Sequence, residues 1–273
     1  MDLTDVPTLR AFLERHGVSA RKGLGQHFLC SKRVVDAIAA RLEGYAGALE
    51  IGPGPGVLTS ALSSRIPHVR ALEIDERMVG ALAESAPSVE VVRGDALGTN
   101  LEDLLLDLPT PRAIVSNLPY YITGPLITRI AEVRAHYSRA VLMMQREVGT
   151  RILAPPKNSD RGSLSVYLQI QFEISKVADV PPGSFWPPPK VDSIVLEFMP
   201  KETGLSPQDK LAFFRLVRGS FKQPRKTLAN NLGAMGFSRE AVEAALVAAG
   251  LDVRARPADP DLGEWRELFE HLR

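Results

Sequence analysis

Short apolar segments alternate with amphipathic segments through the first half of the chain, and this alternation constrains the fold more than any other feature. Segments with the length and composition of buried strands lie at residues 48–51, 69–74, 89–95, 112–117 and 138–145. Helical patterns lie between them, as at 57–66 and 75–85, and another precedes them at 31–43. Buried strands joined by helices form crossover units around a parallel sheet. The pattern therefore predicts an α/β fold.

The pattern changes toward the C-terminus. Residues 191–198 alternate between apolar and polar side chains after a proline-rich segment, which predicts an edge or antiparallel strand. Four helical segments follow, at 206–219, about 224–235, 238–250 and 262–271. The first begins with Ser206 and Pro207, a typical N-cap followed by an N1 proline. We expect a sheet domain over 1–200, with a helical and basic lead-in over 1–45, and a small helical domain over 201–273.

The composition excludes several classes of protein. The single cysteine, Cys30, makes neither an internal disulfide nor a cysteine-rich zinc site, and the five histidines lack metal-ligand spacing. We therefore predict no metal. Apolar runs are shorter than the roughly 18 residues of a membrane span, and the N-terminus is acidic where a signal peptide is basic. We expect a cytoplasmic monomer without a membrane partner.

A glycine-rich loop at 52–56, GPGPG, follows the first of these strands. Glycine permits close backbone approach to a ligand, although Val57 breaks the G-x-G-x-x-G spacing of dinucleotide-binding proteins. Glu73 ends the next strand, where an acid typically accepts hydrogen bonds from ribose hydroxyls. Asp95 ends the third strand and is suited to an adenine amino group. Because these strands end at one edge of the sheet, the three features predict an adenosine cofactor there rather than a plain turn with solvated carboxylates.

The fourth strand ends in the tetrapeptide Asn117–Leu118–Pro119–Tyr120. An exocyclic adenine amine is a poor nucleophile because its lone pair is delocalised into the ring. The Asn117 side-chain oxygen and the Leu118 carbonyl would accept hydrogen bonds from its two N–H groups and localise that lone pair. Pro119 favours the extended backbone that directs the Leu118 carbonyl toward the amine. Tyr120 offers a face for base stacking. The tetrapeptide beside a cofactor loop predicts methyl transfer to adenine N6.

Charge is unevenly distributed although the net charge is only +1. Residues 71–107 hold nine acids and two bases, whereas 21–33 hold four bases and 215–226 hold five bases, both without an acid. Phosphates respond to the local field rather than to net charge. The two basic runs are therefore candidate contacts for a polyanion, with solvated helix faces as the alternative interpretation.

Several of these segments together resemble one enzyme family. They include RKGLGQHFL (21–29), LEIGPGPGVLT (49–59), SNLPYYIT (116–123), FWPPPKVDS (185–193) and FKQPRKTL (221–228). In order and number they resemble the rRNA adenine N6-dimethyltransferases, specifically those of the bacterial small subunit, from about residue 19 to the C-terminus. The resemblance implies a Rossmann-like S-adenosylmethionine-dependent methyltransferase sheet with a helical C-terminal domain. It also implies that two adjacent adenosines in the 3′-terminal hairpin of 16S rRNA, in the immature small subunit, are each methylated twice.

The resemblance assigns roles to matching positions. The residues that resemble the family's cofactor contacts are His27, Leu29, Gly52, Gly54, Glu73, Asp95 and Asn117. Those that resemble its target-base site are Asn117, Leu118, Pro119, Tyr120 and Phe185. Those in its RNA-binding segments are Arg21, Lys22, Lys222, Arg225 and Lys226. Two departures bear on these roles, because the family usually has asparagine where this chain has His27 and often has arginine where this chain has Pro224.

Two other functions remain open at this point. One is a resistance-type enzyme of the same fold that methylates a large-subunit rRNA adenosine. The other is a ribosome assembly or binding factor without essential catalysis. The intact loop, Glu73, Asp95 and tetrapeptide favour an enzyme over a binding factor. A small-molecule methyltransferase would leave the basic helical appendage without a task.

Overall fold

The computed structural model describes residues 1–18 and 27–273, and it divides into two compact units. The first contains Met1–Gly149 and Ile174–Pro200, and the second contains Thr150–Glu173 and Lys201–Arg273. Arg21 and Lys22, predicted to contact RNA, lie outside the described residues. The units divide after residue 200 as expected, but residues 150–173, expected in the sheet domain, group with the C-terminal helices.

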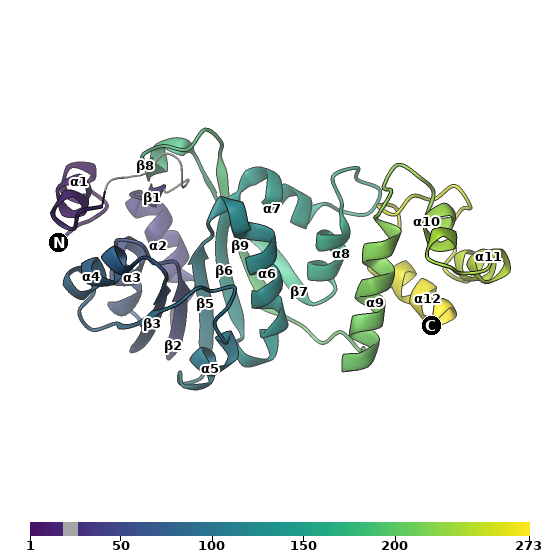
Figure 1. The fold of residues 1–273 in the computed structure, drawn as a ribbon, viewed down its shortest axis with the longest axis horizontal. Helices are drawn as coiled ribbons and strands as arrows, with labels where there is room; N and C mark the ends of the chain where they lie inside the picture. The colour runs from purple at the N-terminus through teal and green to yellow at the C-terminus, as the bar shows by residue number, and fades with distance from the viewer. Residues whose placement is uncertain (19–26) are drawn as a thin grey trace. The chain divides into compact units, whose positions relative to one another are not determined.

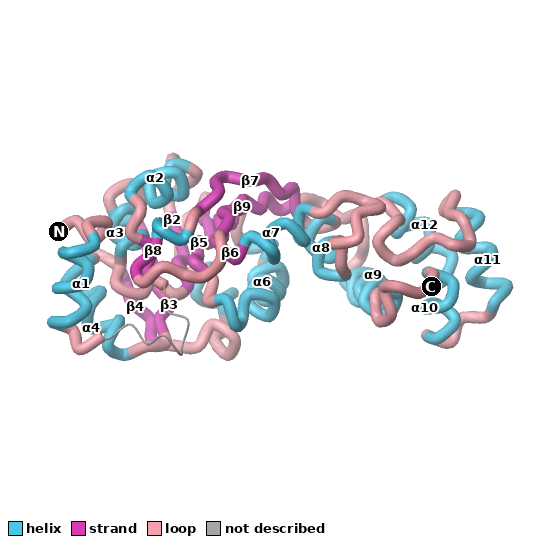
Figure 2. Tube along the Cα trace, turned by 90° about the horizontal axis from the view of Figure 1, so that it is seen from above, coloured by secondary structure: helices cyan, strands magenta, loops and turns pink. Residues whose placement is uncertain are grey.

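A seven-stranded sheet forms the centre of the first unit, with helices on both of its faces (Figures 1 and 2). The strand order is β4-β3-β2-β5-β6-β9-β7. Their bounds are β2 Gly47–Ile51, β3 His68–Glu73, β4 Glu90–Arg93, β5 Arg112–Asn117, β6 Arg139–Gln145, β7 Phe172–Val180 and β9 Ser193–Pro200. The first five in this order are parallel, and β9 pairs antiparallel with β6. The predicted α/β class and the antiparallel strand are confirmed.

The order of the strands reverses at β2. The chain passes from β2 to β3 and β4 on one side, and then to β5 and β6 on the other. Ile51 of β2 pairs with Ser116 of β5, and the Ser116 hydroxyl donates to the Ile51 carbonyl at 2.7 Å. Gly52 and Asn117 therefore leave the sheet side by side. Such a switch point is where open α/β sheets bind ligands.

Helices cover the sheet and continue the apolar pattern of the sequence. Their bounds are α1 Val6–Arg15, α2 Lys32–Ala40, α3 Val57–Ser63, α4 Glu76–Ser85, α5 Leu101–Leu106, α6 Thr123–Glu132 and α7 Arg146–Leu153, with 3₁₀ turns η2 Tyr120–Ile122, η3 Arg134–His136 and η4 Pro182–Ser184.

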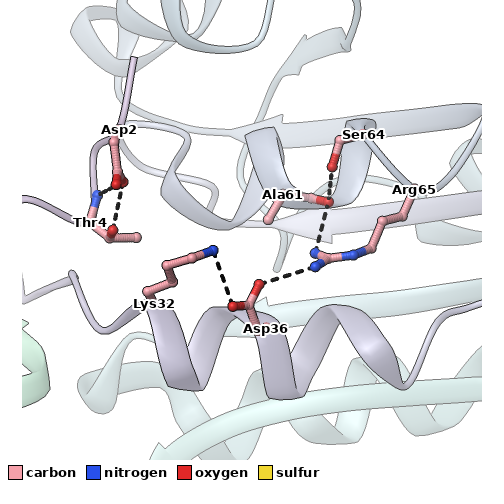
Figure 3. Close-up of polar contacts among 7 residues, drawn as sticks. All are labelled: Asp2, Thr4, Lys32, Asp36, Ala61, Ser64 and Arg65. Carbon is pink, nitrogen blue, oxygen red and sulfur yellow. Dashed lines mark hydrogen bonds and ion pairs between the residues drawn. The ribbon is translucent and has the colours of Figure 1, made fainter.

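Asp36 of α2 lies 3.2 Å from the Lys32 ammonium and 3.1 Å from the Arg65 guanidinium, which joins α2 to the segment after α3 (Figure 3). The Arg65 and Lys32 contacts lower the pKa of Asp36.

A two-stranded antiparallel ladder lies apart from the main sheet. It pairs β1, Phe28–Leu29, with β8, Phe185–Trp186. The Cys30 amide extends it by donating to the Ser184 carbonyl at 2.8 Å. These contacts hold the segment after residue 26 beside the segment that precedes β9, although about 155 positions separate them in the sequence.

The second unit is helical apart from the first two residues of β7. It contains residues 150–153 of α7 and the helices α8 Ser163–Gln169, α9 Pro207–Ser220, α10 Leu228–Ala234, α11 Arg239–Ala248 and α12 Leu262–Leu272. Val166 and Ile170 are buried in the same apolar cluster as Phe213 and Trp265, which is why the α8 region belongs to this unit. The helix expected from about residue 224 begins at Leu228 instead, after the Thr227 N-cap.

Candidate active site at the switch point

A cavity of about 290 Å³ lies at the carboxyl ends of β2, β3 and β5. All the residues predicted to contact the cofactor line it: His27, Leu29, Gly52, Gly54, Glu73, Asp95 and Asn117. Leu118, Pro119 and Tyr120 line it as well. The structure thus brings the glycine loop and the tetrapeptide to one cavity, as expected from strands that end at one edge of a sheet.

The glycine loop is shaped by positive backbone angles. Gly52 has φ of 69° and Gly54 has φ of 56°, in the left-handed region that other residues rarely adopt. This turn aims the Gly54 amide at Glu73, whose carboxylate oxygen accepts its hydrogen bond at 3.1 Å. A side chain at either glycine would strain the loop and move that donor.

Glu73 is held almost entirely by backbone amides. Its other carboxylate oxygen accepts from the amides of Ile74 at 2.8 Å and Asp75 at 2.9 Å. The residue is 6% exposed, and burial raises the pKa of its carboxyl against the opposing effect of these hydrogen bonds. Each carboxylate oxygen has more than one lone pair, so a bound hydroxyl is accommodated on a carboxylate of fixed orientation.

Glu50 is a cavity residue that the sequence interpretation missed. It lies in β2, every residue of which is buried, and is itself 2% exposed. Its Oε2 atom is buried without a hydrogen-bond partner among the described residues. Burial raises the pKa of Glu50 to about 8; the Thr59 hydroxyl opposes this shift, and the charge of Glu73 adds to it. A glutamate inside the fully apolar context of GALEI was the available signal, because a buried acid requires a partner.

Asn117 and Leu118 continue from β5 into the cavity wall. The Asn117 amide nitrogen donates to the His27 carbonyl at 3.4 Å, which leaves the side-chain oxygen as the acceptor available to a ligand. The Leu118 amide donates to the Met143 carbonyl at 2.9 Å and so prolongs the strand ladder. The two acceptors needed by the expected chemistry, the Asn117 side-chain oxygen and the Leu118 carbonyl, therefore lie at the end of a hydrogen-bonded strand.

Tyr120 and His27 form the neighbouring part of the wall. The Tyr120 hydroxyl shares a 2.7 Å hydrogen bond with the Ser193 hydroxyl, and burial raises the pKa of Tyr120. The His27 ring lies 5.9 Å from the Tyr120 ring, and its Nδ1 lies 2.7 Å from the Pro187 carbonyl. A carbonyl only accepts, so Nδ1 carries a proton and donates it.

Phe185 does not join this cavity. Its side chain is 4% exposed and packs in the apolar core of the first unit, where β8 pairs with Leu29. The stacking of Phe185 on the target base therefore stays a prediction, and the structure places the ring in the core beside the cavity-lining Leu29. Pairing of β8 with β1 buries the ring, and the sequence pattern alone does not reveal that pairing.

Asp95 is exposed, and so are Lys222, Arg225 and Lys226. One Asp95 carboxylate oxygen accepts from the Leu97 amide at 2.9 Å. Lys222, Arg225 and Lys226 lie in the second unit, in the loop between α9 and α10, although Arg225 and Lys226 were expected in a helix from about residue 224. Across residues 1–18 and 27–273, no cluster of three or more potential ligands is arranged for a metal, and no helix is long and apolar enough to cross a membrane.

Comparison with known proteins identifies the family. The model of the ribosomal RNA adenine dimethylase family matches residues 17–272. The chain belongs to this family. It is 40% identical over 265 residues to ribosomal RNA small subunit methyltransferase A of Geobacter sulfurreducens, an alignment that covers 94% of this chain and 96% of the relative. The predicted family and the predicted enzyme class are thereby confirmed.

Solved structures of similar fold support the dimethylase assignment. A dimethyladenosine transferase from Plasmodium falciparum is 27% identical, with a TM-score of 0.73 over 89% of this chain and 96% of that one. The 23S rRNA methyltransferase ErmE is 30% identical, with a TM-score of 0.69 over 90% of this chain and 99% of that one. Both likenesses extend over most of this dimethylase chain and therefore include residues of both units.

Proposed function

We propose that the chain transfers methyl groups from S-adenosylmethionine to N6 of two adjacent adenosines in the 3′-terminal hairpin of 16S rRNA, forming N6,N6-dimethyladenosines during small-subunit biogenesis. The observation that carries this proposal is the single cavity lined by Glu73, Asp95 and Asn117. Small-subunit names among relatives that match nearly the whole chain favour this substrate over the large-subunit rRNA of ErmE.

The residues of the cavity fit the proposed donor. S-adenosylmethionine carries an ammonium, a ribose diol and an adenine amine. The buried Glu50 oxygen without a partner suits a cationic group, because a buried carboxylate is stabilised by an opposite charge. Glu73 suits the diol, and Asp95 suits the amine. The methyl group on the donor's sulfonium is the electrophile that the cofactor supplies when bound.

The chain's own contribution is to hold the target amine. The Asn117 side-chain oxygen and the Leu118 carbonyl accept hydrogen bonds from the two N–H groups of adenine N6. These contacts keep the nitrogen lone pair directed at the methyl group. Tyr120, fixed through Ser193, stacks on the purine. Alignment of the reacting atoms and fixed dipoles then provide much of the rate without a strong base.

The second unit would hold the RNA. Lys222, Arg225 and Lys226 are exposed cations in one loop, and we assign them to phosphate contacts. The target adenosines must leave their stack to reach Asn117, at a cost of a few kcal/mol unless they are already unpaired. We also propose that the enzyme acts as a cytoplasmic monomer on an immature small subunit.

Methylation of purified ribosomal subunits tests this function. Small and large subunits from a strain lacking the protein are incubated with the enzyme and donor labelled in the methyl group, and the rRNA is analysed by mass spectrometry. We expect two dimethyladenosines near the 3′ end of 16S rRNA. Label confined to 23S rRNA would instead establish the large-subunit reaction, and label in neither would contradict the enzyme assignment.

A further inference from the structure

An exposed aromatic side chain stands beside the cavity that binds the proposed target. Tyr121 lines the cavity and is 75% exposed. It is the only aromatic among the exposed large hydrophobic side chains of residues 1–18 and 27–273, and only it and Ile74 of that group line the cavity. An exposed aromatic ring at the edge of a nucleic-acid site offers a stacking surface to a base.

Tyr121 and Tyr120 point in different directions. Both lie in the 3₁₀ turn η2, in which successive side chains are about 120° apart around the axis. Tyr120 is directed to Ser193 and is half-buried, whereas Tyr121 remains mostly in solvent. One turn thus presents two rings, of which the inner one belongs to the cavity wall and the outer one lies at the mouth.

The acidic lining of the cavity favours a contact with a base rather than with a phosphate. Glu73 and Asp95 line the same cavity, and both carry negative charge when ionised. Phosphates are repelled by such groups, whereas the face of a nucleobase stacks on an aromatic ring irrespective of base identity. A nucleotide next to a flipped-out base has also lost one stacking neighbour.

We propose that Tyr121 stacks on the base that flanks the target adenosine and so replaces the stacking lost when the target enters the cavity. This inference rests on the proposed function and adds a specific contact for single-stranded rRNA. Tyr121 is a positioning residue in this account, because it touches the neighbouring nucleotide rather than the reacting atoms.

Steady-state methylation of small subunits by four enzymes tests the contact: wild type, Tyr121→Phe, Tyr121→Leu and Tyr121→Ala. Phenylalanine keeps the aromatic face, so we expect wild-type kinetics. Leucine keeps an apolar side chain without the face, and alanine removes both. For these two variants we expect KM for the small subunit to rise on the order of tenfold. The value of kcat should stay within about twofold.

Calorimetric titration with S-adenosylmethionine distinguishes a contact of the Tyr121 ring with a base from a contact with the cofactor. We expect all four proteins to bind the donor with equal affinity. Weaker donor binding by Tyr121→Ala would assign the ring to the cofactor and overturn the proposal. A wild-type KM in Tyr121→Ala, or in Tyr121→Leu, would overturn the stacking role. Absence of wild-type activity on small subunits would refute the proposed function itself, whatever the variants do.

Discussion

The substitution Glu50→Gln tests the electrostatics of the cavity in the cofactor-free protein. Burial raises the pKa of Glu50 from 4.5 to about 8, so between these values the folded protein holds a proton that the unfolded chain releases. This bound proton stabilises the folded protein relative to the unfolded chain. The stabilisation is fully present below pH 4.5 and is lost as the pH rises through 8, because the folded state binds the proton more tightly. Glutamine has nearly the same shape but does not titrate.

The size of the effect follows from the pKa difference. One pKa unit corresponds to 1.36 kcal/mol, so the contribution of Glu50 to the free energy of unfolding falls by about 2 kcal/mol between pH 6 and pH 8. Urea unfolding at both pH values, for wild type and Glu50→Gln, measures it. The two proteins differ only at residue 50, so the difference between their pH dependences isolates Glu50.

A matched variant controls for the loss of a carboxylate in general. Glu43 is exposed, so Glu43→Gln should keep the pH dependence of the wild type. Glu50→Gln should lack the 2 kcal/mol decrease. If the unfolding free energies of Glu50→Gln and wild type change in parallel from pH 6 to pH 8, Glu50 is not a buried neutral acid and the reasoning about its partner fails.

Three further predictions concern the cofactor, the target base and the RNA. If Glu50 pairs with the donor's cationic group, donor binding at pH 7 releases close to one proton from wild type and none from Glu50→Gln. Calorimetric titrations in buffers of different ionisation enthalpy measure the number of protons released. Equal release by the two proteins would contradict the pairing. Asn117→Ala should reduce methyl transfer by about 10²- to 10³-fold in single-turnover assays while donor affinity stays within a few-fold; full activity would remove the assigned role. Replacing Lys222, Arg225 and Lys226 together with alanine should weaken rRNA binding and make its log–log salt slope shallower by about 2, measured by filter binding at several salt concentrations. An unchanged slope would place the phosphate contacts elsewhere.

The sequence was sufficient to predict the part of the site that parallel strands supply. The strands ending at Ile51, Glu73 and Asn117 are short segments of mostly buried residues, and parallel topology requires their carboxyl ends to meet at one edge. The residues at and just after these carboxyl ends therefore line one cavity, irrespective of how the helices pack on the sheet. Local pattern and a general rule of sheet topology were enough.

Features set by pairing between distant segments were not predictable in this way. The β1–β8 ladder joins Phe28 to Trp186 and buries Phe185, and neither two-residue strand has a pattern of its own. The edge strand β7 is mostly exposed or half-exposed, so its alternation is weak. Helix α8 was assigned to the wrong unit because its packing partners, including Phe213, are distant in the sequence.

The most direct test of the account is a crystal structure of this protein grown with S-adenosylhomocysteine, the product of the proposed donor. The account predicts density in the cavity, with the ribose at Glu73, the adenine at Asp95 and the sulfur facing Asn117. Density for the ligand at another place, or a cavity closed by side chains in the crystal, would contradict it.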